Sequence, residues 1–165
     1  MNTYIDPALF GAPTLVSGLG QWENLMRRGI ASARCGNTAL AAHLYGQSLH
    51  IAENLLSRGH VGLEADDRIA AFVVTHLNLA DLYAEQAQLD AAVHYRCRAH
   101  EALMAMLRDP DGEPAMQSAA CRHCRETHAA LMAHLSEHGS DPAILAALRA
   151  GCMPFPLHGS SVLVH

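Results

Sequence analysis

The chain has no lysine, and only 5% of its 165 residues are aromatic, so arginine supplies all of its fixed positive charge. Its 11 arginines are dispersed along the sequence, and the formal net charge is −5 at pH 7. This balance gives no electrostatic attraction to nucleic acid. The sequence also lacks an apolar run long enough to cross a membrane. We therefore expect neither a nucleic acid nor a membrane as a partner.

Sequence patterns of catalysis are missing as well. No glycine-rich phosphate loop follows a predicted strand, and no serine, histidine or aspartate lies in a recognisable nucleophile motif. The five cysteines are an odd number, and the opening MNTYIDPALFGAP has neither the early basic residues nor the unbroken apolar stretch of a secretory signal. Reduced thiols are typical of the cytoplasm. We therefore expect a cytoplasmic protein that is not an enzyme.

Apolar residues at intervals of three and four dominate the rest of the sequence and predict an all-α fold. Glycine, proline and capping residues divide this pattern into six segments. The predicted helices span residues 21–35, 38–56, 64–87, 89–108, 114–138 and 142–150. The predicted domain organisation is an irregular lead over 1–20, a helical domain over 21–151 and an extended apolar tail over 152–165.

The helical segments carry an internal repeat with a period of 51 residues. Three sets of residues recur at this spacing: Gly29, Ala80 and Leu131; Gly36, Ala87 and His138; and Ala41, Ala92 and Ala143. Repetition at such a period indicates stacked pairs of helices. A stack of this kind forms a curved surface that holds another molecule and usually carries no chemistry of its own.

The repeated units resemble tetratricopeptide repeats over roughly residues 21–151. The residues that carry the resemblance are Gly29, Gly36, Ala41, Tyr45 and Leu49 in the first unit, Leu79–Tyr83, Gln86–Ala92, Tyr95 and Ala99 in the second, and Leu131, Ala143 and Ala150 in the third. The period departs from the 34 residues that are usual in that family. HLNLADLY at 76–83 and ALMAHLSEHGSDP at 130–142 are also similar to an uncharacterised family of short proteobacterial proteins with such repeats. The resemblance implies a right-handed solenoid of about three helical hairpins with long helices.

The same resemblance implies a concave groove, lined by the first helix of each unit, that binds a protein or peptide segment as an adaptor or chaperone would. The groove residues would be Glu23, Met26, Ile30, Arg34, Leu77, Asp81, Glu85, Arg125, His128 and Met132. The apolar members would grip the segment and the charged members would set its register. Asp81 and Glu85 would repel a terminal carboxylate. Core packing is the alternative role for the methionines and leucines.

One cluster has the chemistry of a metal site. In CRHCRETH, residues 121–128, Cys121, Cys124 and His128 share one helix face, and thiolate and imidazole ligands suit zinc or copper. A fourth ligand would come from Cys97, His94 or Cys152. The alternative is that the two cysteines pack as small apolar residues, in which case no cofactor is expected. A homodimer formed through the apolar groove or the SSVLVH tail is a further hypothesis.

Overall fold

The computed structural model describes residues 18–57 and 63–151, and within these ranges the backbone forms six helices, without a strand. The helices are α1 (Gly18–Arg34), α2 (Thr38–Ser57), α3 (Ala65–Glu85), α4 (Leu89–Arg108), α5 (Pro114–His138) and α6 (Pro142–Gly151). The all-α prediction and its six helices are confirmed. The predicted apolar tail over 152–165 lies outside the described residues.

The start of α1 corrects the predicted irregular lead, because residues 18–20 are already helical. Leu19 packs against a cluster of Ala52, Leu55 and Ala71, so burial of this side chain extends the helix by a turn. The rest of the predicted lead lies outside the described residues.

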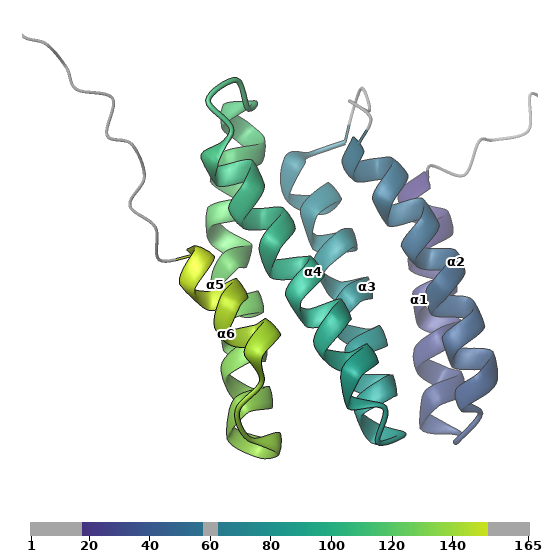
Figure 1. Ribbon diagram of the computed structural model, residues 1–165. Coiled ribbons are helices and arrows are strands. Elements are labelled where there is room, and N and C mark those ends of the chain that lie inside the picture. The colour runs from purple at the N-terminus through teal and green to yellow at the C-terminus, as the bar shows by residue number, and fades with distance from the viewer. Residues whose placement is uncertain (1–17, 58–62, 152–165) are drawn as a thin grey trace, which may run out of the picture.

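The helices form two layers, with α2, α4 and α6 in front of α1, α3 and α5 in the view of Figure 1. Consecutive helices contact each other throughout, from α1 with α2 to α5 with α6. Within the rear layer α3 contacts both α1 and α5, and within the front layer α4 contacts α6. The backbones of the front-layer helices α2 and α4 do not approach each other closely. The rear layer is therefore the more continuous of the two.

The first two turns of the repeat have the same backbone structure. Gly36 (φ 76°) and Ala87 (φ 58°) both adopt left-handed conformations. In each turn the next residue donates its N–H to a carbonyl five residues back, Asn37 to Ser32 and Gln88 to Tyr83, both at 2.9 Å. This is the Schellman motif, which ends a helix and reverses the chain. The 51-residue spacing therefore holds for these turns.

The third turn is out of register with the predicted repeat. The left-handed residue is Gly139 (φ 91°) rather than His138, and the buried residue of the following helix is Ile144 rather than Ala143. Asp141 caps this helix, since its Oδ1 accepts the N–H groups of Ala143 at 2.8 Å and Ile144 at 3.1 Å. The predicted equivalences of His138 and Ala143 are wrong, because α5 contains an additional residue between Leu131 and Gly139, while the turn itself has the same length as the other two.

Small residues allow the paired helices to approach closely. A Cβ atom at Gly29 would lie 2.5 Å from Cε1 of Tyr45, so α1 can pack on α2 only with glycine there. Ala80 and Leu131, which share this repeat position, are both fully buried. Trp22 of α1 donates its indole N–H to Thr75 of α3 at 2.7 Å, which ties the first hairpin to the second.

Among the helices described, none is both long and apolar enough to cross a membrane.

Candidate functional site

Four of the predicted groove residues line one depression between α1 and α3. They are Ile30, Arg34, Asp81 and Glu85. The remaining lining comes from Ala33, Tyr45, Asn78 and Leu82, and the depression has a volume of about 190 Å³. Its charged residues lie near the ends of α1 and α3, next to the Schellman turns at Gly36 and Ala87, and Tyr45 of α2 also contributes. The repeat therefore brings these charged side chains together.

The floor of the depression is polar and its charge is predominantly negative. Tyr45 is 3% exposed, and its hydroxyl donates to Asn78 Oδ1 at 3.4 Å. Burial raises the pKa of Tyr45, the carboxylates of Glu85 and Asp81 raise it further, and Arg34 opposes them with a smaller effect. At the Tyr45 hydroxyl, the negative charges of Glu85 and Asp81 therefore have a larger electrostatic effect than the positive charge of Arg34.

Asp81 has a second function in the fold, because it binds a buried arginine. Arg96 of α4 is 7% exposed; it donates from Nη2 to Asp81 Oδ1 at 2.7 Å and from Nη1 to His134 Nδ1 of α5 at 2.9 Å. Arginine has no acceptor, so His134 accepts at Nδ1 and carries its proton on Nε2. Burial lowers the pKa of His134, and the charges of Arg96 and His138 lower it further. This contact joins α3, α4 and α5.

The apolar residues predicted for the groove lie in or beside the core instead. Met26 is 4% exposed and packs with Ala41, Tyr45, Leu79 and Leu82, so its predicted role in binding is wrong. Leu77 is half-buried against a cluster that includes Ile69, Phe72 and Leu103. Glu23 and Met132 are exposed, but neither lines this depression. Core packing, the alternative for the methionines and leucines, is confirmed for Met26.

Arg125 and His128 line a different cavity, which is open to solvent and lies between α4, α5 and α6. Its other lining residues are His100, Met104, Cys124, Leu148 and Gly151, and its volume is about 300 Å³. The predicted groove residues of the third unit therefore do not continue the depression between α1 and α3.

The predicted metal ligands do not converge. Within residues 18–57 and 63–151, no three His, Cys, Asp or Glu side chains are placed to hold a metal ion. Cys121 is exposed, whereas Cys124 packs against the core and donates its thiol proton to the carbonyl of Cys121 at 3.0 Å. Of the two cysteines, only Cys124 shares a cavity with His128.

The fourth-ligand candidates differ in their surroundings. Cys97 is buried among Val93, Leu131, Ile144 and Ala147. This burial, with smaller contributions from Glu101 and Asp141, raises the pKa of the Cys97 thiol to about 11, which disfavours the thiolate that a metal requires. His94 is exposed on α4, and Cys152 lies outside the described residues.

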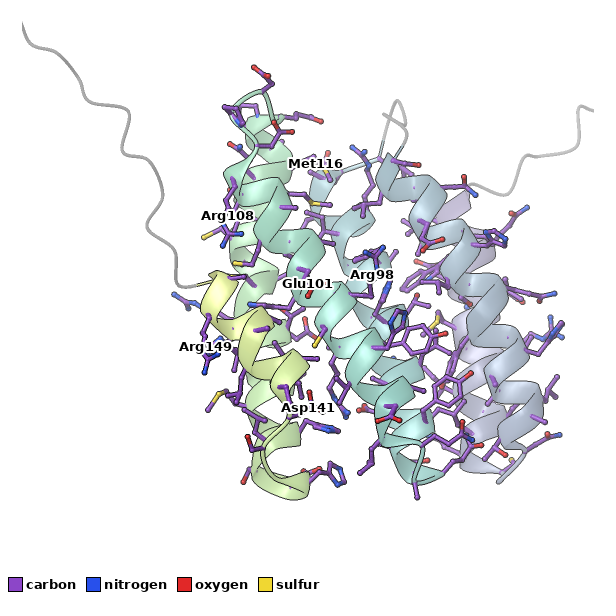
Figure 2. The ribbon with its side chains drawn as sticks, in the orientation of Figure 1. Arg98, Glu101, Arg108, Met116, Asp141 and Arg149 are labelled. Carbon is purple, nitrogen blue, oxygen red and sulfur yellow. The ribbon has the colours of Figure 1, made fainter. Side chains whose placement is uncertain are left out.

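Two functional candidates on α4, Arg96 and His100, were absent from the sequence-based prediction. Figure 2 shows Arg98, Glu101 and Arg108 along the same helix, and all three are exposed. Arg96 and His100 lie instead on the buried face that the sequence assigns to Ala92, Ala99 and Leu103. The sequence did contain a signal for them, because a charged or polar residue at a position of the apolar face is expected to be buried and to need a partner.

The sequence profile of one protein family, described as Protein of unknown function (DUF2753), matches residues 20–156. The match includes most of α1 and all of the other five described helices. No curated protein and no solved structure matches the chain.

Proposed function

We propose that this chain, which belongs to the family described as Protein of unknown function (DUF2753), is a helical-repeat module that binds a segment of another protein in the depression between α1 and α3. The three hairpins would stack as a right-handed, tetratricopeptide-like solenoid. The serial contacts of α1 with α3 and of α3 with α5 support this arrangement. The module would act by holding its partner, without catalysis.

The observation that carries the proposal is the composition of the depression. Ile30 and Leu82 provide an apolar wall, while Asp81 and Glu85 provide exposed carboxylates beside it. Asp81 remains 67% exposed although it binds Arg96, so its carboxylate can accept a further hydrogen bond. Apolar contact next to a fixed charge is the combination by which extended or helical segments are recognised.

Charge complementarity specifies the partner. Because the two carboxylates outweigh Arg34 at the Tyr45 hydroxyl, the depression favours a cation. We therefore expect a segment with an aliphatic or aromatic residue followed closely by arginine or lysine. The basic side chain would contact Glu85, and the apolar residue would contact Ile30.

The test is selection of random displayed peptides on the immobilised protein, followed by affinity measurement for synthetic copies of the selected sequences. We expect an apolar residue and a basic residue at constant spacing. Glu85→Arg should weaken binding at least about tenfold, which corresponds to the loss of one charge contact and its replacement by repulsion. Glu23→Arg is the matched control, since Glu23 is exposed on α1 but does not line the depression.

Two results would contradict the proposal. The first is selected peptides that bind wild type and Glu85→Arg equally. The second is a dimer of the chain that Glu85→Arg dissociates in sedimentation equilibrium, since the occupant of the depression would then be a second copy. We do not propose the zinc or copper site as a second function, because the described cysteines and histidines form no three-ligand group.

A further inference from the structure

The cavity between α4, α5 and α6 contains a buried histidine whose protonation can be assigned from its hydrogen bonds. His100 is 3% exposed, and its Nδ1 lies 3.0 Å from Thr127 Oγ1. The Thr127 hydroxyl in turn donates to the carbonyl of Cys124 at 3.1 Å. A carbonyl can only accept, so the single proton of this hydroxyl is used there. Thr127 must therefore accept from His100, which places a proton on Nδ1.

The other ring nitrogen is then an acceptor. Burial lowers the pKa of His100, and the charges of His128 and Arg108 lower it further, so the imidazole is neutral and has one N–H. Nε2 consequently presents a lone pair. Within the part of the chain that the structure describes, His100 Nε2 is buried and has no hydrogen-bond partner. A buried acceptor without a donor is costly, which makes it a marker of a missing ligand.

The surroundings of this nitrogen indicate what would bind. Nε2 faces the end of α6, because a Cβ atom added at Gly151 would lie 3.0 Å from it. Met104, Cys124 and Leu148 give the cavity predominantly apolar walls, and Arg125 also lines it. The volume of about 300 Å³ is at the lower end of the range for small-molecule sites. The walls are thus largely apolar, with Arg125 and His128 as further polar side chains and His100 Nε2 as a buried acceptor.

We propose that this cavity is a binding site for a small apolar molecule that carries a hydroxyl or N–H group, which donates to His100 Nε2. The site is independent of the protein-binding depression, because the two share no lining residue. Thr127 acts as a positioning residue, since it holds the proton on Nδ1 and leaves Nε2 free to accept.

Phenol is the probe, and its methyl ether anisole is the matched control, because anisole has a similar ring but no donor. The full chain, labelled with ¹⁵N in its histidines, is titrated with each compound while the ring nitrogens are followed by NMR. We expect His100 Nε2 to resonate as an unprotonated nitrogen and to shift on saturable addition of phenol. Anisole should bind about tenfold more weakly, as expected when a buried acceptor is left without a donor.

Two substitutions on α4 separate the site from unspecific binding. His100→Leu removes the acceptor, so phenol and anisole should then bind equally. His94→Leu removes an exposed histidine of the same helix and should preserve the preference for phenol. If His100→Leu does not fold, the wild-type spectrum still tests the assignment.

Three outcomes would overturn the proposal. One is a proton on Nε2 instead of Nδ1. Another is equal binding of phenol and anisole by wild type. The last is an Nε2 resonance that already shows a hydrogen bond and does not respond to phenol, since the chain itself or a water molecule would then satisfy the acceptor.

Discussion

Arg96 and His100 lie one turn apart on α4, and both side chains are buried and reach α5. The Arg96 layer, consisting of Asp81, Arg96 and His134, is closed, because the guanidinium donates to a partner on either side. The His100 layer, consisting of His100 and Thr127, is open, because one ring nitrogen of His100 lacks a partner among the described residues. The side chains of Arg96 and His100 are buried to a similar extent. They differ in hydrogen bonding, because Arg96 has a partner on α3 and another on α5, and one ring nitrogen of His100 has none among the described residues.

This difference separates polar groups that maintain the fold from a polar group that can serve a ligand. A satisfied buried network specifies one arrangement of the helices that it joins, and here it joins three. An unsatisfied acceptor adds cost without specifying anything. We infer that the Arg96 layer stabilises the packing of α3, α4 and α5. In the His100 layer, the unpaired Nε2 lowers the stability of the fold but is available to the proposed ligand.

The largest expected effect is that of breaking the closed layer. Arg96→Met should lower the free energy of unfolding by about 2–4 kcal/mol, because His134 loses its donor and remains buried. Asp81 contributes little to this loss, since its side chain is 67% exposed and can be solvated. Urea denaturation measures the change.

Arg98→Met is the control for this experiment, because Arg98 is exposed on the same helix (Figure 2). We expect its effect to stay within about 0.5 kcal/mol. Equal stability of the two variants would mean that the hydrogen bonds of Arg96 do not contribute, and the distinction between the layers would fail.

A smaller effect is expected from Thr127→Val in the open layer. Valine has nearly the same shape but no hydroxyl, so both nitrogens of His100 would lack a partner, at a cost of about 1–2 kcal/mol. The proton should then distribute between Nδ1 and Nε2, which histidine ¹⁵N spectra detect.

Thr75→Val provides the matched comparison for this substitution. Thr75 is also fully buried and accepts from Trp22 at 2.7 Å, so a similar loss of stability is expected. The protonation of His100 should not change in that variant. A change in both variants, or in neither, would contradict the assigned role of Thr127.

The helices were predictable from the sequence because their limits depend on local signals. Gly36, Pro114 and Pro142 end or begin helices through backbone properties that need no distant contact. The register of the third repeat was not predictable in the same way. The additional residue lies in α5, before Gly139. Small residues such as Ala143 and Ala147 also look alike in the sequence until packing buries one and exposes the other.

The candidate sites were predicted only in part, for a related reason. The exposed charges Arg34, Asp81 and Glu85 were assigned to one surface because they share faces of two repeated helices. The apolar residue Met26 was assigned to the same surface, but it packs in the core. The α5 partners of Arg96 and His100 are 38 and 27 residues away, so these contacts depend on how the helices pack rather than on the repeat. The solenoid and its tetratricopeptide likeness remain predictions.

The third prediction concerns the effect of acid on the free energy of unfolding, and it is the smallest of the expected changes at neutral pH. Among the described residues, three imidazoles are buried, those of His76, His100 and His134. Burial is the first cause that lowers the pKa of each. At His76 the hydrogen bond with the Phe72 carbonyl opposes burial, and the charges of Arg98 and His94 add to it. The added charges are those of His128 and Arg108 at His100, and of Arg96 and His138 at His134, where Asp141 and Glu137 oppose them.

A histidine with a lowered folded-state pKa takes up its proton first in the unfolded chain, whose pKa is about 6.5. The free energy of unfolding should therefore be complete above about pH 6.5 and fall as the pH drops through that value toward the folded-state pKa. The Asp66 carboxyl, whose pKa is lowered chiefly by its hydrogen bond from Arg122, loses its charge below this range and so does not contribute to the pH dependence.

Urea denaturation between about pH 7.5 and pH 5 measures how the free energy of unfolding changes with pH. His134→Gln keeps an acceptor for Arg96 and should flatten the slope while it preserves the closed layer, and His100→Gln should flatten it in the open layer. A free energy that does not change over this range would mean that folding does not lower the pKa of these imidazoles. A slope that neither substitution reduces would mean that other groups cause it, and either result would contradict the role assigned to the buried imidazoles.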